Sequence, residues 1–311
     1  MAFAMVFPGQ GSQAVGMMAE LYDEHEIIPA LFNTASERLG FDLWSLIRNG
    51  PKEELDKTEN TQPALLACGI ATWQLWRQAG GGIPKVVAGH SLGEYCALIA
   101  AGVLEFGDAI TLVRDRGRYM QMAVPPGRGG MAAILGLEDE QVTEICRRFS
   151  GQSTVSVANF NSPGQVVIAG QAEAVGRAME AAKAAGAKRT IKLDVSVPSH
   201  CALMTTAADQ FSLRLSQVEF NNASIPVIQN ADTEQRTEAG ALKAAMPKQL
   251  HQPVRWTDTI LKIKKQGILQ IVECGPGRVL SGLIKRIDSE LTAYPVFDSA
   301  TLATTLTAVT V

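Results

Sequence analysis

The sequence predicts an α/β protein with a parallel sheet and a second, smaller unit inserted into the chain. Short apolar or β-branched runs alternate with helical patterns over most of the 311 residues, which is typical of parallel sheets covered by helices. Between residues 126 and 193 the order changes to β-α-β-β-α-β. With 46% hydrophobic and 19% charged residues, the chain is long enough to bury a large core.

Composition excludes several classes of function. The net charge of −3 leaves no overall basic field to hold nucleic acid or an anionic membrane. No apolar run reaches membrane-spanning length. The cysteines are odd in number and widely spaced, without the patterns of zinc sites or disulfide frameworks: Cys68, Cys96, Cys146, Cys201 and Cys274. We therefore expect a reduced, cytoplasmic protein with no metal.

The first third of the chain twice shows the pattern of a strand followed by a turn and a helix. An apolar run over residues 1–7 has no basic segment before it and is too short for a signal peptide, so it predicts a buried strand. A glycine-rich turn follows at 8–13, and helical patterns cover 17–39 and 62–80. A second β-branched run at 85–91 then passes directly into the helical pattern of 92–104.

The inserted unit is predicted from the order of its segments. Strands are expected at 129–136, 153–160, 165–170 and 187–196, and helices at 138–149 and 172–186. This order is the split βαβ, ferredoxin-like arrangement. Residues 126–193 would form this subdomain, and 1–125 with 194–311 one discontinuous domain around it. The alternative is that these strands extend the main sheet.

The last third returns to the first pattern. Apolar runs at 225–230 and 268–277 predict further strands, and helical patterns cover 239–251, 256–266 and 277–290. The final residues, 301–311, carry little signal, and we expect them to fray.

Ser91 is the strongest candidate for chemistry. It stands in "GHSLG" between Gly89 and Gly93, where a strand turns sharply into a helix, and this is the context of a nucleophile elbow. The two glycines allow backbones to approach closely around a strained turn. The amides of the following helix, beginning with that of Leu92, would face negative charge on a substrate. The alternative is an ordinary turn serine.

A nucleophilic serine needs a base, and the chain has four histidines. His25 lies in an acidic segment that predicts a solvated face, and His90, adjacent to the nucleophile, is predicted to be a packing residue. His200, in a loop after Pro198, is favoured over His251, because such loops carry catalytic groups. No acidic residue is evident to orient the imidazole, so a carbonyl could take that place.

Two further features bear on substrate binding. The turn "PGQGSQ" could supply a second oxyanion donor from Gln10, although such a turn can be only a turn. On the helix after residue 108, Arg116 shares an apolar face with Val113 and Met120. A guanidinium there needs an anionic partner, which would be either an internal carboxylate or the carboxylate of a substrate.

Taken together, seven motifs closely resemble the malonyl-CoA:acyl carrier protein transacylases. They are, in order, "FPGQGSQ", "GHSLGEY", "RDRGRYMQ", "VANFNSPGQVVIAG", "VSVPSHCALM", "QLHQPVRWTD" and "ECGPGRVLSGLIKRI". The similarity extends from Phe3 to about Leu291. It implies an α/β-hydrolase-like core with a ferredoxin-like subdomain, which agrees with the partition above.

The resemblance also implies roles for individual residues. By the matching motifs, the nucleophile is Ser91, its base His200, and the oxyanion donors the amides of Gln10 and Leu92. Arg116 would hold the malonyl carboxylate. The backbone carbonyl of Gln249 would orient the histidine, and His251 becomes a neighbour. The additional Arg114 of this chain has no assigned role.

The implied reaction moves a malonyl group from malonyl-CoA to the phosphopantetheine thiol of acyl carrier protein through an ester on Ser91. The resemblance implies no metal and no bound cofactor, and we expect a monomer that binds neither nucleic acid nor membrane. Because such carrier proteins are acidic, a basic docking surface is expected; the candidates are Lys188 and Arg189, and Lys285 and Arg286.

Three rival functions use the same residues differently. A thioesterase or esterase would turn over with water and would not need Arg116. A catalytically silent module would only bind carrier protein, and a lost serine, histidine or arginine would favour it. An acyltransferase for larger acyl groups would have an apolar residue in place of Arg116.

Overall fold

The computed structural model describes residues 2–150, 154–195 and 197–310. Its larger sheet has six strands in the order β10-β9-β1-β2-β7-β8. All neighbours are parallel except β7 and β8. The strands are β1 (Phe3–Phe7), β2 (Val86–Gly89), β7 (Val227–Ile228), β8 (Gln235–Arg236), β9 (Gln270–Cys274) and β10 (Thr292–Val296). The predicted α/β class is confirmed.

Helices cover both faces of this sheet because its central strands are apolar on both sides. Met5 and Phe7 of β1 pack into one core, while Ala4 and Val6 face the other. The second core is closed by α12 (Trp256–Lys265) and α13 (Val279–Ile287). The first is closed by α1 (Ala19–Glu24), α2 (Ile27–Leu39), α3 (Leu43–Asn49), α4 (Lys52–Leu55), α5 (Thr58–Gln78), α6 (Gly93–Ala100), α7 (Phe106–Ala123), α10 (Thr205–Ser216), α11 (Ala239–His251) and α14 (Ser299–Thr310).

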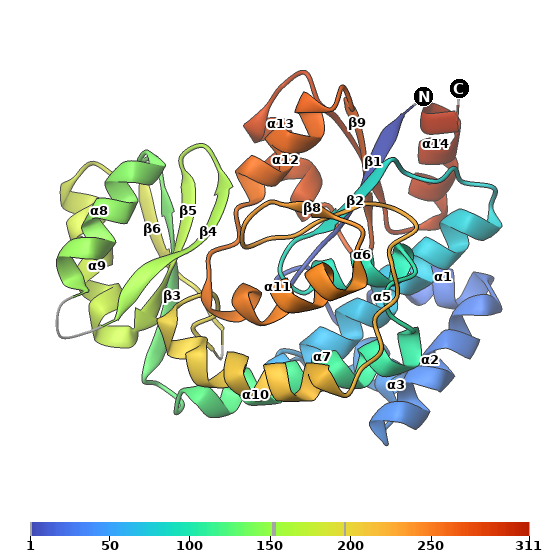
Figure 1. The fold of residues 1–311 in the computed structure, drawn as a ribbon, viewed down its shortest axis with the longest axis horizontal. Helices are drawn as coiled ribbons and strands as arrows, with labels where there is room; N and C mark the ends of the chain where they lie inside the picture. Colours follow the sequence, from blue (N-terminus) through green and yellow to red (C-terminus); the bar gives the residue numbers. More distant parts are fainter. Residues whose placement is uncertain (1, 151–153, 196, 311) are drawn as a thin grey trace.

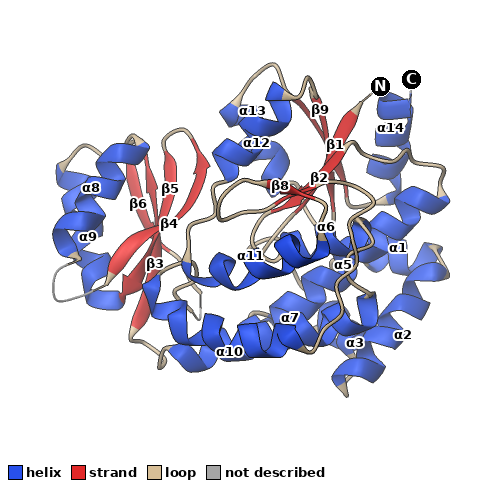
Figure 2. Ribbon diagram, viewed as in Figure 1, coloured by secondary structure: helices blue, strands red, loops and turns tan. Residues whose placement is uncertain are grey.

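The smaller sheet is separate, so its strands do not extend the main sheet. It is antiparallel, with the order β4-β5-β3-β6, which is the ferredoxin-like arrangement. Its elements are β3 (Gly129–Leu135), α8 (Asp139–Phe149), β4 (Val155–Ser162), β5 (Gln165–Gln171), α9 (Ala172–Ala184) and β6 (Arg189–Lys192). Figure 2 shows both helices on the outer face of this sheet.

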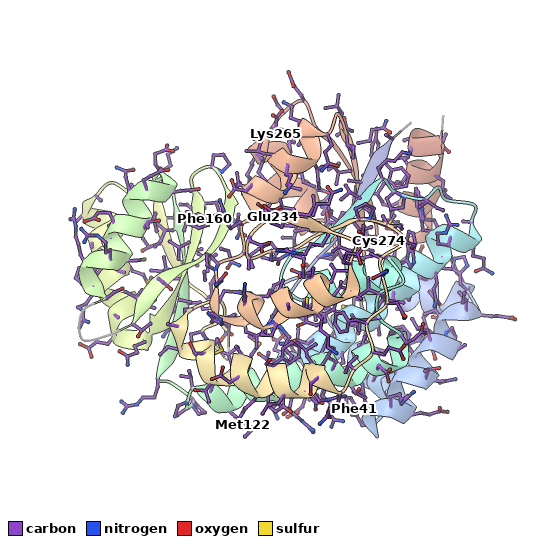
Figure 3. The ribbon with its side chains drawn as sticks, in the orientation of Figure 1. Phe41, Met122, Phe160, Glu234, Lys265 and Cys274 are labelled. Carbon is purple, nitrogen blue, oxygen red and sulfur yellow. The ribbon has the colours of Figure 1, made fainter. Side chains whose placement is uncertain are left out.

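Side-chain alternation gives the small sheet two buried faces. Ala132 and Ile134 of β3 pack under α8 and α9. Met131 and Ala133 point the other way and pack with Cys201, in the chain that follows the subdomain. Phe160, labelled in Figure 3, lies on the side of the subdomain toward the larger domain, and its amide donates to the Val254 carbonyl at 2.9 Å. The inner face of the small sheet is thus a wall against the core domain.

Several predicted elements have different bounds. The helix expected over 17–39 is divided at His25 and Glu26 into α1 and α2, and β6 ends at Lys192 instead of continuing to 196. Two predicted strand boundaries, the start at Ser153 and the end at Ser196, lie outside the described residues. The prediction that the final residues fray is wrong for 301–310, which form most of α14 and pack on β10. No helix among the described residues combines the length and apolarity needed to cross a bilayer.

Candidate active site

The topology of the large sheet gathers the site at one edge. Because β1, β2 and β7 are parallel neighbours, the chain leaves all three at the same edge of the sheet. Gln10 follows β1, Ser91 follows β2, and Asn230 follows β7. The Ser91 amide donates to Asn230 Oδ1 at 2.6 Å, so adjoining strand ends are connected directly beneath the candidate nucleophile.

Ser91 occupies the sharp turn that the sequence predicts. Its φ of 52° is in the left-handed region, which is strained for a serine. The flanking glycines are required by space: a Cβ on Gly89 would lie 1.9 Å from the Gly93 carbonyl carbon, and one on Gly93 would lie 2.1 Å from the Phe7 carbonyl oxygen. The turn therefore closes tightly over β1 and presents the Ser91 hydroxyl to the cavity that it lines.

The histidine beside this hydroxyl is His200. Its Nε2 lies 2.8 Å from Ser91 Oγ, and its Nδ1 lies 2.7 Å from the backbone oxygen of Gln249. A carbonyl can only accept, so Nδ1 carries the proton and Nε2 is left to accept from the serine hydroxyl. His251, the last residue of α11, has no such contact in the described residues.

The end of α11 explains why a carbonyl is free to do this. The last four carbonyls of a helix lack partners within the helix, and α11 ends at His251, two residues before Pro253. His200 takes two of them, because its backbone amide also donates to the Leu250 carbonyl at 3.0 Å. With a φ of 61°, His200 is held in its loop by these contacts.

Burial keeps His200 in its neutral form. The side chain is 3% exposed, and burial, followed by the positive charge of Arg116, lowers the pKa of His200 to about 3. The imidazole is therefore an unprotonated acceptor at neutral pH, as a general base must be.

Arg116 lies against the same hydroxyl. Its Nη2 is 3.5 Å from Ser91 Oγ and 2.9 Å from Gln249 Oε1, and its Nη1 donates to Gln62 Oε1 at 2.8 Å. The guanidinium packs over the Tyr95 ring, 5.6 Å from its centroid. Both tethers are neutral amides, and the described part of the chain places no carboxylate within 4.0 Å of it.

This arrangement bears on the choice between an internal ion pair and a substrate carboxylate. Arg116 is 1% exposed, and burial lowers its pKa. The hydrogen-bond partners of the guanidinium are uncharged, and the Glu94 carboxylate, which favours its charged form, lies on the far side of the Gln249 amide. An anionic group entering beside Ser91 would pair with the guanidinium directly.

The two predicted oxyanion donors flank the nucleophile. Leu92 precedes the first turn of α6, and Gln10 lines the cavity from the turn after β1. Among the described residues neither backbone amide donates to another group. Both amides are therefore available to a negatively charged oxygen.

The cavity is about 360 Å³ and lies between the two sheets. Ser91, His90 and His200 line it on the core side, and the inner face of the small sheet closes it with Met131, Val167, Asn159 and Asn161. His90 is fixed by Asn161 Oδ1 at 2.8 Å and by packing on Trp256. Lys52, the first residue of α4, and Asp56, which follows that helix, also line the cavity.

The remaining sequence candidates lie elsewhere. His25 follows α1 and is half-buried, not on a solvated face. Arg114 donates to the Leu39 carbonyl and packs over Phe41 (Figure 3), so it connects α7 to the end of α2. The four basic docking candidates are exposed but divided between the small subdomain, with Lys188 and Arg189, and α13, with Lys285 and Arg286.

Sequence reasoning missed several polar residues of the site, among them Asn230 and Glu94. Asn230 joins the elbow from β7, and the signal for it was its place at the end of the predicted strand 225–230. Glu94 is 1% exposed in the first turn of α6. A carboxylate three residues after a nucleophile gives no sequence signal of its own, because the first turn of a helix commonly carries one.

Comparison with known proteins places the chain in one family. Residues 4–301 match the model of the acyl transferase domain. The malonyl CoA-acyl carrier protein transacylase of Salmonella typhimurium is 52% identical over 98% of this chain and 99% of its own length. An acyl carrier protein S-malonyltransferase from Vibrio cholerae superposes with a TM-score of 0.96 at 52% identity, covering 98% of this chain and all of that one.

A third relative was solved with a partner. It is a malonyl-transacylase in complex with its type II PKS acyl-carrier protein, with a TM-score of 0.98 and 52% identity over 99% of this chain and 100% of that chain. Likeness at this level extends to both sheets.

Proposed function

The chain belongs to the malonyl CoA-acyl carrier protein transacylases, and from this premise we propose that Ser91 takes up the malonyl group as an ester and gives it to a carrier-protein thiol. The overall activity is that of an acyl carrier protein S-malonyltransferase of fatty acid synthesis. The observation that carries the assignment to this site is the buried Arg116, which lies 3.5 Å from Ser91 Oγ and whose hydrogen-bond partners are all uncharged.

In the first half-reaction, Ser91 Oγ attacks the thioester carbonyl carbon of malonyl-CoA. His200 Nε2 accepts the hydroxyl proton, since it lies 2.8 Å away and is neutral. The Gln249 carbonyl stabilises the imidazolium that forms, through the proton on Nδ1. The carbon–sulfur bond then breaks, and the coenzyme A sulfur takes the proton from Nε2, so that the malonyl ester and a neutral histidine remain.

The negative oxygen of the tetrahedral intermediate needs donors that face it before the reaction begins. The amides of Gln10 and Leu92 meet this need, since they have no other acceptor in the described residues. One such donor commonly contributes about 3 kcal/mol of transition-state stabilisation.

In the second half-reaction the phosphopantetheine thiol of acyl carrier protein replaces coenzyme A. Its proton passes to His200 Nε2 as its sulfur attacks the ester carbonyl, and the proton moves on to Ser91 Oγ as the carbon–oxygen bond breaks. The free Ser91 hydroxyl and the neutral His200 are thereby regenerated, and the reaction needs no cofactor. The two substrates use one site in turn, which gives ping-pong kinetics.

Arg116 accounts for the choice of malonyl. A malonyl carboxylate would pair with the buried guanidinium, whereas an acetyl group would leave it unpaired. A larger apolar acyl group meets the same penalty. This pairing also favours the transferase over a thioesterase, for which a guanidinium beside the nucleophile has no use.

The carrier protein is expected to dock on basic side chains near the cavity, and the protein is expected to act in the cytoplasm. Lys188 and Arg189 precede the loop that leads to His200, while Arg286 on α13 donates to Gln165 Oε1 at 2.6 Å. Arg286 therefore connects α13 to the small subdomain, and Lys188 and Arg189 lie within that subdomain at the start of β6.

Initial-rate kinetics test this function. With malonyl-CoA and holo acyl carrier protein both varied, a ping-pong transferase gives parallel double-reciprocal lines and malonyl carrier protein in equal amount to free coenzyme A. Coenzyme A released with free malonate, at a rate independent of carrier protein, would instead identify a thioesterase.

A further inference from the structure

Glu94 is a buried carboxylate that the reaction above does not use. It lies in the first turn of α6, 1% exposed, and accepts three hydrogen bonds. The Asn230 amide and Gln249 Nε2 donate to its Oε2 at 2.9 and 3.0 Å, and Gln229 Nε2 donates to its Oε1 at 3.2 Å. The donors come from the loop after β7 and from α11, so Glu94 joins both to the nucleophile helix.

The orientation of the two amide side chains is fixed by arginines. Arg116 donates to Gln249 Oε1 at 2.9 Å, and Arg236 donates to Gln229 Oε1 at 3.1 Å. Each amide must therefore present its Nε2 to Glu94. Burial raises the pKa of Glu94, whereas the hydrogen bonds from its three donors and the positive charge of Arg116 act in the opposite direction and favour the ionised carboxylate.

Two of these partners hold the backbone of Ser91. Gln249 Nε2 also donates to the Ser91 carbonyl at 2.9 Å, and Asn230 Oδ1 accepts from the Ser91 amide at 2.6 Å. Asn230 Nδ2 donates to the Gly89 carbonyl at 2.6 Å. A residue at φ 52° keeps its strained conformation only where its surroundings fix it, and here both of its backbone polar groups are bound by side chains of residues that also donate to Glu94.

Gln249 extends the same connection to substrate selection. Its side chain lies between Glu94 and Arg116, donating to one and accepting from the other, while its own carbonyl orients His200. A shift of this residue would move the nucleophile backbone, the base and the guanidinium together.

We propose that Glu94 is a positioning residue that, through Gln249 and Asn230, aligns Ser91 for attack and sets Arg116 for the malonyl carboxylate. The inference rests on the proposed function, since it names the residue that couples the two halves of that site. Glu94 touches no substrate atom in this account and acts only through its neighbours.

The test is Glu94→Gln, which keeps the size of the side chain and removes its charge. The amide of a glutamine has one oxygen that accepts and one NH₂ group that donates. Its NH₂ group would therefore face at least one of the donors that now bind Glu94. Acylation by malonyl-CoA is expected to slow by about 10- to 100-fold. Because Arg116 loses its fixed position, the ratio of malonyl to acetyl loading rates is also expected to fall, by about tenfold or more.

Glu273→Gln is the matched control. Glu273 is also fully buried, at 0% exposure, and accepts from the Leu280 and Ser281 amides and from Ser281 Oγ. It caps α13, and within the described ranges none of these partners lines the cavity. It is expected to lower the melting temperature to a similar extent without changing the malonyl-to-acetyl ratio. For both variants we would measure the rate of acylation by malonyl-CoA, the ratio of malonyl to acetyl loading rates and the melting temperature.

The outcomes separate the two proposals. If the unaltered protein forms no malonyl ester, the proposed function fails and this inference fails with it. If it loads malonyl and Glu94→Gln keeps the same ratio as Glu273→Gln, Glu94 is only a structural residue and this inference alone is overturned.

Gln229→Leu extends the test should Glu94→Gln not fold. It removes one donor to Glu94 from a residue that, in the part of the chain described, has no hydrogen bond to Ser91 or Arg116, and a leucine is compatible with the neighbouring Met246. A smaller fall in the same ratio is expected. An unchanged ratio would contradict the inference.

Discussion

At the scale of single residues, the hydroxyl of Ser91 has a neutral imidazole at 2.8 Å and a buried guanidinium at 3.5 Å. Burial produces both properties, because it disfavours the charged form of His200 and removes water from Arg116. The neutral form of the histidine suits proton transfer, and the desolvated guanidinium suits recognition of a carboxylate. In the proposed reaction, His200 would serve the chemistry and Arg116 the selection of the substrate.

Replacing Arg116 by alanine tests selection. Acylation by malonyl-CoA is expected to fall by about 100- to 1,000-fold, because a buried charge partner is lost, while acetyl-CoA loading stays within about tenfold of its original rate. Arg118→Ala on the same helix is the control, since Arg118 is exposed and pairs with Glu59 at the surface. Equal losses for malonyl and acetyl in Arg116→Ala would contradict the assigned role.

The depressed pKa of His200 predicts a pH dependence of stability. Between about 6.5, the ordinary value, and about 3, its value in the folded protein, His200 takes up a proton only when the chain is unfolded. Its contribution to the free energy of unfolding is therefore present above pH 6.5 and is lost as pH falls toward 3.

Unfolding of the unaltered protein and of His200→Asn, followed from neutral to acidic pH, measures this contribution. The stability of the unaltered protein is expected to decline relative to the variant as pH falls. The buried His90, whose pKa is also lowered by burial, is present in both proteins and cancels. The same pH slope in both would show that His200 titrates normally when folded.

Some residues of the site could be predicted from local sequence and others could not. Ser91 is recognisable because its glycines and the strand–helix change lie within a few positions of it. His200 and Gln249 are 49 positions apart, and only the resemblance to a family paired them. Glu94 and Asn230 meet 136 positions apart, and a buried contact of this kind has no signature in either segment.

At the scale of elements, the position of Arg116 depends on the close approach of α7 to α5. Gly117 permits it: a Cβ there would lie 2.7 Å from Glu59 Cα and 2.8 Å from the Thr58 carbonyl oxygen. Since these are backbone atoms, a side chain would have to push the helices apart.

Gly117→Ala is therefore expected to destabilise the protein by about 1–3 kcal/mol and to weaken malonyl loading by displacing Arg116. Gly176→Ala in α9, where a Cβ would meet nothing within 4 Å, is the control and is expected to stabilise by about 0.5–1 kcal/mol. Both values come from denaturant unfolding. An unchanged free energy of unfolding in Gly117→Ala would contradict this, because it would mean that the two helices can move apart at little cost.

Elements with strong periodicity were predicted well, and short or weakly patterned ones were not. The pattern over 239–251 corresponds to α11. The strand β10 was missed because "TAYPV" contains a proline and only its last residue is buried, which is acceptable at the edge of a sheet. The final helix α14 lacks charged residues, so it shows no polar face in sequence, yet Leu302 and Val309 are buried against the core.

At the scale of the whole molecule, the two sheets have separate tasks. The parallel sheet brings Ser91 and Asn230 to one edge, and Met131 and Val167 of the small antiparallel sheet line the cavity on its other side. Figure 1 shows the small sheet lying beside the larger domain. The order of strands and helices predicted both sheets. The small sheet comes from one continuous segment of the chain, and the strands of the large sheet come from the segments before and after it. The cavity between them depends on how the units pack, which the order of elements does not specify.

Docking of the carrier protein belongs to this scale. Charge reversal of Lys188 and Arg189, and separately of Lys285 and Arg286, to glutamate is expected to raise the KM for acyl carrier protein, more at low salt than at high salt. Loading from malonyl-CoA, measured without carrier protein, is the internal control and should not change. An unchanged KM for either pair removes that pair from the docking surface.

The most direct measurement is the intact mass of the protein after brief mixing with malonyl-CoA alone. The account predicts a malonyl adduct that is absent from Ser91→Ala, persists in water and disappears when holo acyl carrier protein is added, with malonyl carrier protein formed in its place. Accumulation of free malonate without a lasting adduct, or an adduct that survives in Ser91→Ala, would contradict it.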